Sequence, residues 1–283
     1  MTPVDRNNTE QREATSEGSR SADNGATAGD SPSTNGELAI EASGLVRTFG
    51  SGDAEVRAVD GVDLSVKAGS LAMIVGPSGC GKTTLLTLIA GVLEPDEGEV
   101  AVYGTRWDEL GGNEQTRVRG RLIGFVFQEF NIIPTLSTIE NAMIPALIHG
   151  ASQQEARERA KERLDDVGLG DRTDSTPGEL SGGMLQRLSI ARALVADPAL
   201  LICDEPTANL DAKTGGMIMD LLSDLCGSEN SEGRRRSVLA VTHDARIFDY
   251  AHVIHEMEDG KISGRRTPED RTGEDGEKED DAS

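Results

Sequence analysis

Short apolar runs alternate with amphipathic segments along most of the chain. Five runs of strand length span residues 71–75, 123–127, 200–203, 238–241 and 253–256, and we expect them to form a mostly parallel sheet. Four segments have helical spacing, at residues 82–90, 153–167, 184–195 and 212–225. Earlier runs near 38–42, 56–59 and 99–103 are expected to add antiparallel strands. The alternation predicts an α/β fold with an antiparallel β subdomain.

The two ends of the chain lack this pattern. Residues 1–36 are rich in Ser, Thr, Asn, Gly and Asp, and residues 264–283 form a second polar, acidic segment. Such segments bury too little apolar surface to offset the entropy lost on ordering, so we expect two disordered tails. One folded domain is expected between them, at residues 37–263. Residues 134–177 hold helical patterns and no strand, which indicates a helical insertion within that domain.

The composition is strongly acidic. The 283 residues include 50 Asp and Glu against 28 Lys and Arg, a formal net charge of −22 at pH 7. Nucleic-acid binding needs a basic footprint, so this charge argues against DNA or RNA as a partner, and against direct adsorption to an anionic membrane. Most of the excess lies between the tails, where lysine is scarce. We interpret this as adaptation to a salt-rich cytoplasm; the alternative is an ordinary acidic protein.

The cysteines and the apolar runs indicate the cellular compartment of the protein. Cys80, Cys203 and Cys226 are odd in number and are not at metal-ligand spacing, which is typical of a reduced cytosolic compartment. The N-terminus has no apolar signal segment, and no apolar run approaches the roughly 20 residues that span a bilayer. A role at a membrane is therefore expected to come through a partner.

A phosphate-binding loop follows the strand at 71–75 and opens the helix at 82–90. It consists of Gly76, Pro77, Ser78, Gly79, Cys80, Gly81, Lys82 and Thr83, with Thr84 directly after it. Glycines let successive backbone N–H groups curl around phosphate oxygens, and the helix N-terminus adds partial positive charge. Lys82 then suits the β- and γ-phosphates, and the Thr83 hydroxyl suits Mg²⁺. The small Cys80 side chain is interpreted as fitting the loop without a redox role.

The apolar run at 200–203 ends in two carboxylates, Asp204 and Glu205. Asp204 suits the role of holding Mg²⁺ through a water, and Glu205 suits that of a general base acting on the attacking water. Apolar strands often end in acidic residues, so the pattern alone is weak. Together with the phosphate-binding loop it predicts ATP hydrolysis.

A second candidate anion site opens the helix at 184–195. Ser181, Gly182 and Gly183 combine a capping hydroxyl with exposed backbone N–H groups. One nucleotide site needs a single such helix start, so two of them suggest a composite site in which one copy of the chain closes over nucleotide held by another. The alternative is a capped helix without a ligand.

In this order, the motifs resemble those of the ATP-binding subunits of ABC transporters, over about residues 37–264. The resemblance implies a P-loop NTPase core with antiparallel β and helical subdomains, and ATP with Mg²⁺ at the site. It implies that Phe49 stacks on adenine, where relatives often have Tyr. It also implies that Gln128 contacts Mg²⁺ and the attacking water, and that Ser181, Gly182 and Gly183 close over the γ-phosphate of the opposite copy.

The resemblance also extends to the residues after the two carboxylates. Asn209, Leu210 and Asp211 match the loop known as the D-loop, and His243 matches the switch histidine, with Glu205 as the catalytic carboxylate. A lone His after an apolar strand is usually structural. Its place in this series favours the catalytic role.

Residues 123–128, 139–141 and 204–211 resemble, more narrowly, the lipoprotein-releasing and macrolide-export group, although Ala208 stands where that group usually has Gly. This implies a homodimer, separate transmembrane permease subunits, and a peripheral location at the cytoplasmic face of the cell membrane. In the family, a permease helix docks just after Gln128; here the residues are Phe130, Ile132, Ile133, Pro134 and Leu136. The alternative is that several of these are core residues.

Three other functions compete with a transporter ATPase. One is an ABC ATPase that regulates a membrane complex without moving a solute. Another is a soluble ABC protein of DNA repair or translation, which the acidic charge and the absence of a coiled-coil pattern or a second cassette disfavour. The last is a nucleotide-binding module without catalysis, which the presence of Glu205 and His243 disfavours.

Overall fold

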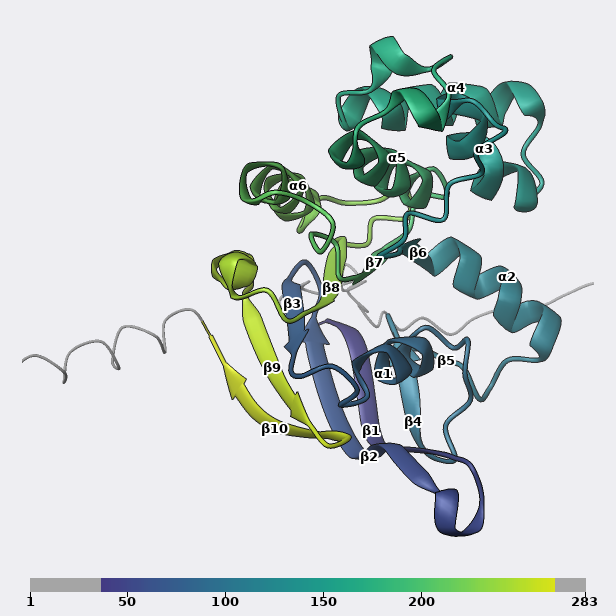
Figure 1. Ribbon diagram of the computed structural model, residues 1–283. Helices are drawn as coiled ribbons and strands as arrows, with labels where there is room; N and C mark the ends of the chain where they lie inside the picture. The colour runs from purple at the N-terminus through teal and green to yellow at the C-terminus, as the bar shows by residue number, and fades with distance from the viewer. Residues whose placement is uncertain (1–36, 268–283) are drawn as a thin grey trace, which may run out of the picture. The chain divides into compact units, whose positions relative to one another are not determined.

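A computed structural model describes residues 37–267 of the chain. The segment expected as an N-terminal tail and most of the expected C-terminal tail lie outside these residues. The described part contains two β-sheets and several helices (Figure 1).

The larger sheet has six strands in the order β10-β9-β3-β8-β7-β6. Its strands are β3 (Leu71–Val75), β6 (Ile123–Val126), β7 (Leu200–Asp204), β8 (Ser237–Thr242), β9 (Val253–Glu258) and β10 (Lys261–Arg266). β3 pairs in parallel with β8 and β9, and β7 pairs in parallel with β6 and β8, while only β10 is antiparallel to its neighbour. The carboxyl ends of five strands therefore meet at one edge, as the expected parallel sheet requires.

The smaller sheet is antiparallel, with the order β2-β1-β4-β5. Its strands are β1 (Leu38–Phe49), β2 (Val56–Lys67), β4 (Glu97–Val102) and β5 (Thr105–Arg106). The first two are much longer than the expected runs, because a register shift between Ala42 and Leu45 lets β1 continue past Gly44. A polar or glycine position that interrupts an apolar run does not end a strand when a bulge absorbs it.

Six α-helices lie within residues 37–267. They are α1 (Lys82–Ile89), α2 (Gly112–Leu122), α3 (Thr138–Ile148), α4 (Gln153–Asp166), α5 (Gly182–Leu194) and α6 (Ala212–Leu225). Short 3₁₀ turns lie at Gly52–Ala54, Gly170–Arg172, Pro177–Glu179 and Ala245–Tyr250. Capping boxes start α3 at Ser137 and α4 at Ser152, so both helix starts are fixed by local side chains. No helix among the described residues is long and apolar enough to cross a bilayer.

Two hydrophobic cores lie on opposite faces of the parallel sheet. Alternate residues of β3 divide between them: Met73 and Val75 join the core under α3 to α6, whereas Ala72 and Ile74 join the core shared with α1 and the antiparallel sheet. All four are at most 6% exposed. β3 is thus buried on both faces, which holds the loop that follows it in a fixed place.

The structure differs from the sequence-based expectations at three further points. β6 ends at Val126, so Phe127 is already in the following loop and is 37% exposed. α2 was not expected, because its sequence is almost wholly polar and only Leu122 is buried. β10 extends to Arg266, past the expected domain end at residue 263, because backbone pairing with β9 orders a polar strand that has no apolar run of its own.

Candidate active site

The residues assigned to chemistry converge on the carboxyl edge of the parallel sheet. The phosphate-binding loop follows β3, Asp204 ends β7 with Glu205 next, and His243 follows β8. Gln128 lies in the loop after β6, at the same edge. Ligands of open α/β sheets bind outside the carboxyl ends of the strands, so this edge is the candidate active site.

The phosphate-binding loop depends on glycine at two positions. A Cβ on Gly76 would lie 2.1 Å from the carbonyl oxygen of Met257, and a Cβ on Gly81 would lie 2.0 Å from that of Ala58. Gly81 also has a left-handed φ of 103° as the N-cap of α1. Side chains are therefore excluded where the loop turns into the helix, and its N–H groups remain available to an anion.

Lys82 lies inside this loop. It is 8% exposed, and its Nζ donates hydrogen bonds to the carbonyl oxygens of Gly76 and Pro77, each at 2.8 Å. The Cys80 Sγ lies 3.9 Å from the same Nζ and is buried, so the cysteine packs beneath the loop. Pro77, Ser78, Gly79 and Thr83 are exposed, and Thr84 is half-buried.

The two carboxylates and the histidine form a compact acidic group. Glu205 Oε1 lies 2.7 Å from His243 Nδ1, with the carboxylate side chain 12% exposed and the imidazole 64% exposed. Glu205 adopts a left-handed φ of 48°, and its N–H donates to the carbonyl of Val241 on β8 at 3.0 Å. Strained backbone of this kind persists only where its surroundings fix it, as here through β8.

Asp204 is held in an environment that disfavours its charge. Burial raises its pKa above the ordinary aspartate value, the neighbouring Glu205 raises it further, and Lys82 lowers it in part. A half-buried carboxylate beside a second carboxylate is a place where a cation would bind favourably.

The donor set fits a magnesium ion that shares its ligands with phosphate. Thr83 in the first turn of α1, Asp204 at the end of β7 and Gln128 in the loop after β6 offer one hydroxyl, one carboxylate and one amide oxygen. No group of three His, Cys, Asp or Glu residues within 37–267 is arranged to hold a metal by itself. Mg²⁺ is commonly bound by one or two carboxylates together with nucleotide phosphates, so a sparse protein set is the suitable one.

Gln128 is exposed, and its loop is tied to the loop after β7. The Asn209 side chain donates to the Gln128 carbonyl oxygen at 3.0 Å. The sequence identified Asn209 by resemblance but did not predict this link between the two loops.

The start of α5 has the expected capped form. Ser181 is the N-cap, with its hydroxyl accepting from the Met184 N–H at 3.4 Å, and both Ser181 and Gly182 are exposed. Gly183 is buried against α6, where an added Cβ would lie 2.3 Å from Thr214 Cγ2.

Asp211 and Phe49 also have local structural contacts. The Asp211 carboxylate caps α6 and accepts from the N–H groups of Lys213 and Thr214 and from the Thr214 hydroxyl, so its described contacts are those of a helix cap.

Phe49 ends β1 with 43% exposure, and the Arg47 guanidinium lies 5.1 Å from its ring centroid. An exposed aromatic face at this place is suited to stacking on a nucleobase.

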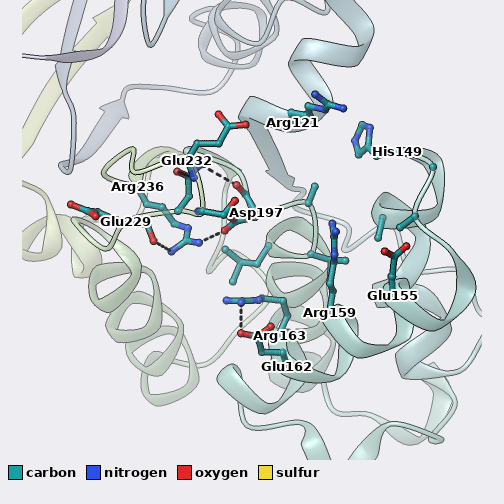
Figure 2. Close-up of a pocket in the computed structure, with 18 residues that line it drawn as sticks. Arg121, His149, Glu155, Arg159, Glu162, Arg163, Asp197, Glu229, Glu232 and Arg236 are labelled. Atoms are coloured by element: carbon teal, nitrogen blue, oxygen red, sulfur yellow. Dashed lines mark hydrogen bonds and ion pairs between the residues drawn. The ribbon is translucent and has the colours of Figure 1, made fainter.

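A cavity of about 890 Å³ lies at the other edge of the sheet. Arg121, Asp197 and Arg236 line it just before β6, β7 and β8, and Arg236 is paired with Asp197 (Figure 2). It contains none of the residues assigned to chemistry. The candidate active site lies at the opposite, carboxyl edge of the sheet.

Two residues that hold the Gln128 loop were not predicted to do so. Arg192 of α5 donates to the carbonyls of Phe130 and Asn131, and Asn141 of α3 donates to those of Ile133 and Leu136. The only feature of the sequence that could have indicated a buried contact for Arg192 was its spacing of one helical turn from the buried Leu188.

Comparison with known proteins identifies the family. The ABC transporter family model matches residues 59–208. An ABC transporter ATP-binding protein of Methanocaldococcus jannaschii is 40% identical over 223 residues, 79% of this chain and 97% of that protein. The lipoprotein-releasing system ATP-binding protein LolD of Chromohalobacter salexigens is 40% identical over 229 residues, 81% of this chain and 94% of that protein.

A solved structure with the same fold has bound nucleotide. The dimeric, post-hydrolysis ATP-binding cassette MJ0796, bound to ADP and phosphate, is 36% identical with a TM-score of 0.72, covering 81% of this chain and 98% of that one. This agrees with the ATP-hydrolysing P-loop fold expected from the motifs. The chain therefore belongs to the ABC transporter family and is an ATP-binding subunit with ATPase activity.

Proposed function

We propose that this chain converts ATP hydrolysis into movement of a separate transmembrane permease, by forming a head-to-tail dimer of two copies. In that dimer, the phosphate-binding loop of one copy and Ser181 to Gly183 of the other enclose each ATP. The observation that carries the proposal is the Glu205–His243 pair, 2.7 Å apart, beside Asp204 and the phosphate-binding loop on one sheet edge.

The residues of this edge have distinct roles. Lys82 and the N–H groups of the loop hold the phosphates, and Phe49 stacks on the adenine. Glu205 accepts a proton from the attacking water, and His243 orients the Glu205 carboxylate. Thr83, Asp204 and Gln128 would hold Mg²⁺, which when bound neutralises phosphate charge.

The permease partner places the chain at the cytoplasmic face of the cell membrane. This proposal is supported by similarity to proteins named for membrane transport systems. LolD belongs by name to a lipoprotein-releasing system. The macrolide export ATP-binding/permease protein MacB of Hyphomonas neptunium is 40% identical, over 79% of this chain and 34% of that protein. The segment after Gln128 offers Ile133, which is 41% exposed, as a permease contact.

We also propose that the folded part is adapted to concentrated salt. Acidic side chains outnumber basic ones in the described residues, and lysine is rare among the basic ones. Dense salt screens the repulsion between such charges, including the repulsion between two copies that meet over ATP.

The function is tested by light scattering and by purification from membranes. With ATP and Mg²⁺ the full chain should hydrolyse ATP and show a transient dimer, and an affinity-tagged chain should retain a multi-spanning membrane protein from detergent-solubilised membranes of its own host. A chain that stays monomeric with ATP, and retains no membrane protein, would contradict the proposal.

A further inference from the structure

The loop that carries Gln128 is held from three sides. We define the Q-segment as residues 128–137. Asn209, after β7, donates to the Gln128 carbonyl at 3.0 Å. Arg192 of α5 and Asn141 of α3 hold the rest of the segment through backbone carbonyls. The segment that begins with Gln128 is therefore held by side chains of α3 and α5 and of the loop after β7.

The middle of the Q-segment adopts an unusual backbone. Phe130 and Asn131 have left-handed φ values of 52° and 49°, a conformation that is rare for non-glycine residues and rarer in succession. This backbone conformation points the carbonyls of both residues toward one donor. A strained conformation of this kind is expected to relax if the donor is removed. Arg192 is the donor to both: its Nη1 lies 2.5 Å from the Asn131 oxygen and its Nη2 2.7 Å from the Phe130 oxygen.

Arg192 has no other bonding partner among the described residues. Its side chain is partly buried, and this burial lowers the pKa of the guanidinium. No Asp or Glu of the described residues lies in ion-pair contact with it, unlike the buried Arg236, which is paired with Asp197. A partly buried guanidinium needs its hydrogen bonds satisfied, and here the two left-handed carbonyls satisfy them. The contact is therefore specific to this backbone shape.

Arg192 lies on the same helix as Ser181 to Gly183, which start α5. A rigid helix transmits a shift of one end to the other, so a movement of the helix start would reach the Phe130 and Asn131 carbonyls, and through them Gln128. We propose that Arg192 is a positioning residue that couples α5 to Gln128 and sets the rate of ATP hydrolysis, with little effect on ATP affinity. The inference rests on the role of Gln128 in the proposed function.

A double-mutant cycle tests this coupling. Arg192→Met and Gln128→Ala are made singly and together in the full chain, and kcat and KM are measured with Mg-ATP. Each single variant should lower kcat by about tenfold or more, because small misplacements of reacting groups are costly, while KM changes by less than about twofold. The double variant should be no slower than the slower single variant, because Arg192 acts through Gln128.

Two further variants exclude a general loss of structure. Arg236→Met removes a buried arginine at the opposite edge of the sheet; it should lower the thermal midpoint and leave kcat unchanged. Arg192→Lys keeps a cation that can reach the carbonyls without the planar fork, so its kcat should lie between those of the wild type and Arg192→Met. If Arg192→Met does not fold, Arg192→Lys replaces it in the cycle. All rates are measured well below the lowest thermal midpoint.

The outcomes separate this inference from the proposed function. A double variant whose loss equals the product of the single losses would overturn the coupling and leave the role of Gln128 intact. An unchanged kcat in Arg192→Met would do the same. If Gln128→Ala alone leaves kcat unchanged, the role of Gln128 in the proposed function fails, and the coupling fails with it.

Discussion

Among single residues, Glu205 is held through both its backbone and its side chain. Its backbone is bonded to β8, and its carboxylate is 2.7 Å from His243. Glu205→Gln keeps the shape but removes the base, so we expect kcat to fall by about 10²–10⁴-fold while ATP still binds. Steady-state hydrolysis and a light-scattering measurement of an ATP-stabilised dimer check this.

The control for Glu205→Gln is Lys82→Ala, which should weaken nucleotide binding itself, as measured by titration with a fluorescent ATP analogue. Lys82→Ala removes the contact with phosphate but keeps the Glu205 carboxylate as the base. Wild-type turnover in Glu205→Gln would show that another group accepts the proton.

Asp204 gives a prediction for stability against pH. Its pKa is raised in the folded protein, so folding favours the protonated carboxyl and ionisation destabilises the fold. This penalty is absent below the ordinary aspartate pKa of about 3.9 and grows as pH rises through the folded pKa. Asp204→Asn should therefore raise the thermal midpoint at about pH 7 without nucleotide, and the gain should shrink as pH falls toward about 3.9.

Differential scanning fluorimetry across that pH range measures the gain. Asp244→Asn is the matched control, since hydrogen bonds to Arg246 hold the pKa of Asp244 below its ordinary value. That variant should lower the midpoint at neutral pH. A gain from Asp204→Asn that is independent of pH would refute the burial argument.

The places of several candidate site residues in the fold could be predicted from the sequence, because they directly follow apolar strands; their roles stay predictions. Asp204 and His243 follow β7 and β8 directly, and parallel strands bring such ends together. The contacts of Lys82 with the loop carbonyls could not be predicted, nor could those of Arg192, because both join side chains to distant or locally folded backbone and leave no period in the sequence.

Among the elements, α5 and α6 approach each other closely at Gly183. Gly183→Ala would place a Cβ 2.3 Å from Thr214 Cγ2, so we expect a loss of about 1–3 kcal/mol in the free energy of unfolding. Adding Thr214→Ser removes that methyl group and keeps the hydroxyl that bonds Asp211, so the double variant should regain most of the loss.

Urea unfolding measures both variants of this pair. Gly182→Ala is the control, because its Cβ would meet only Leu210 and Asn209 atoms, at 3.8 Å and 3.9 Å. It should change the free energy of unfolding little. Equal losses in Gly182→Ala and Gly183→Ala would mean that helix packing is not the cause.

The elements themselves were predictable to different degrees. The buried strands and α6, predicted at residues 212–225, follow from unbroken apolar periods. α2 and β10 could not be predicted, since α2 buries only Leu122 and β10 buries no residue fully. Both depend on neighbours in the fold, on β6 and β9, rather than on their own pattern.

For the whole molecule, the proposed adaptation to concentrated salt makes ionic strength the variable to test. The Debye length falls from about 30 Å at 0.01 M salt to about 3 Å at 1 M, so like charges repel across a domain only in dilute salt. We expect the thermal midpoint and the ATPase rate to rise together as KCl increases from about 0.1 M to above 1 M. Fluorimetry and a coupled ATPase assay check this.

An acidic protein without salt adaptation should instead lose activity over this range, because its nucleotide binding is partly ionic. LolD from another organism, assayed in parallel, is a suitable comparison. Peak activity in dilute salt with a flat thermal midpoint would refute the adaptation and leave the ATPase assignment unaffected.

The bonds of Lys82 to the Gly76 and Pro77 carbonyls have a consequence for nucleotide exchange. The two carbonyl oxygens compete with phosphate for the Lys82 ammonium. A phosphate that binds to Lys82 must displace them, and they can bond to Lys82 again when the phosphate leaves. The Lys82 ammonium therefore keeps hydrogen-bond partners when no phosphate is bound, so we expect these bonds to ease product release. We expect the same bonds to reduce the affinity for nucleotide.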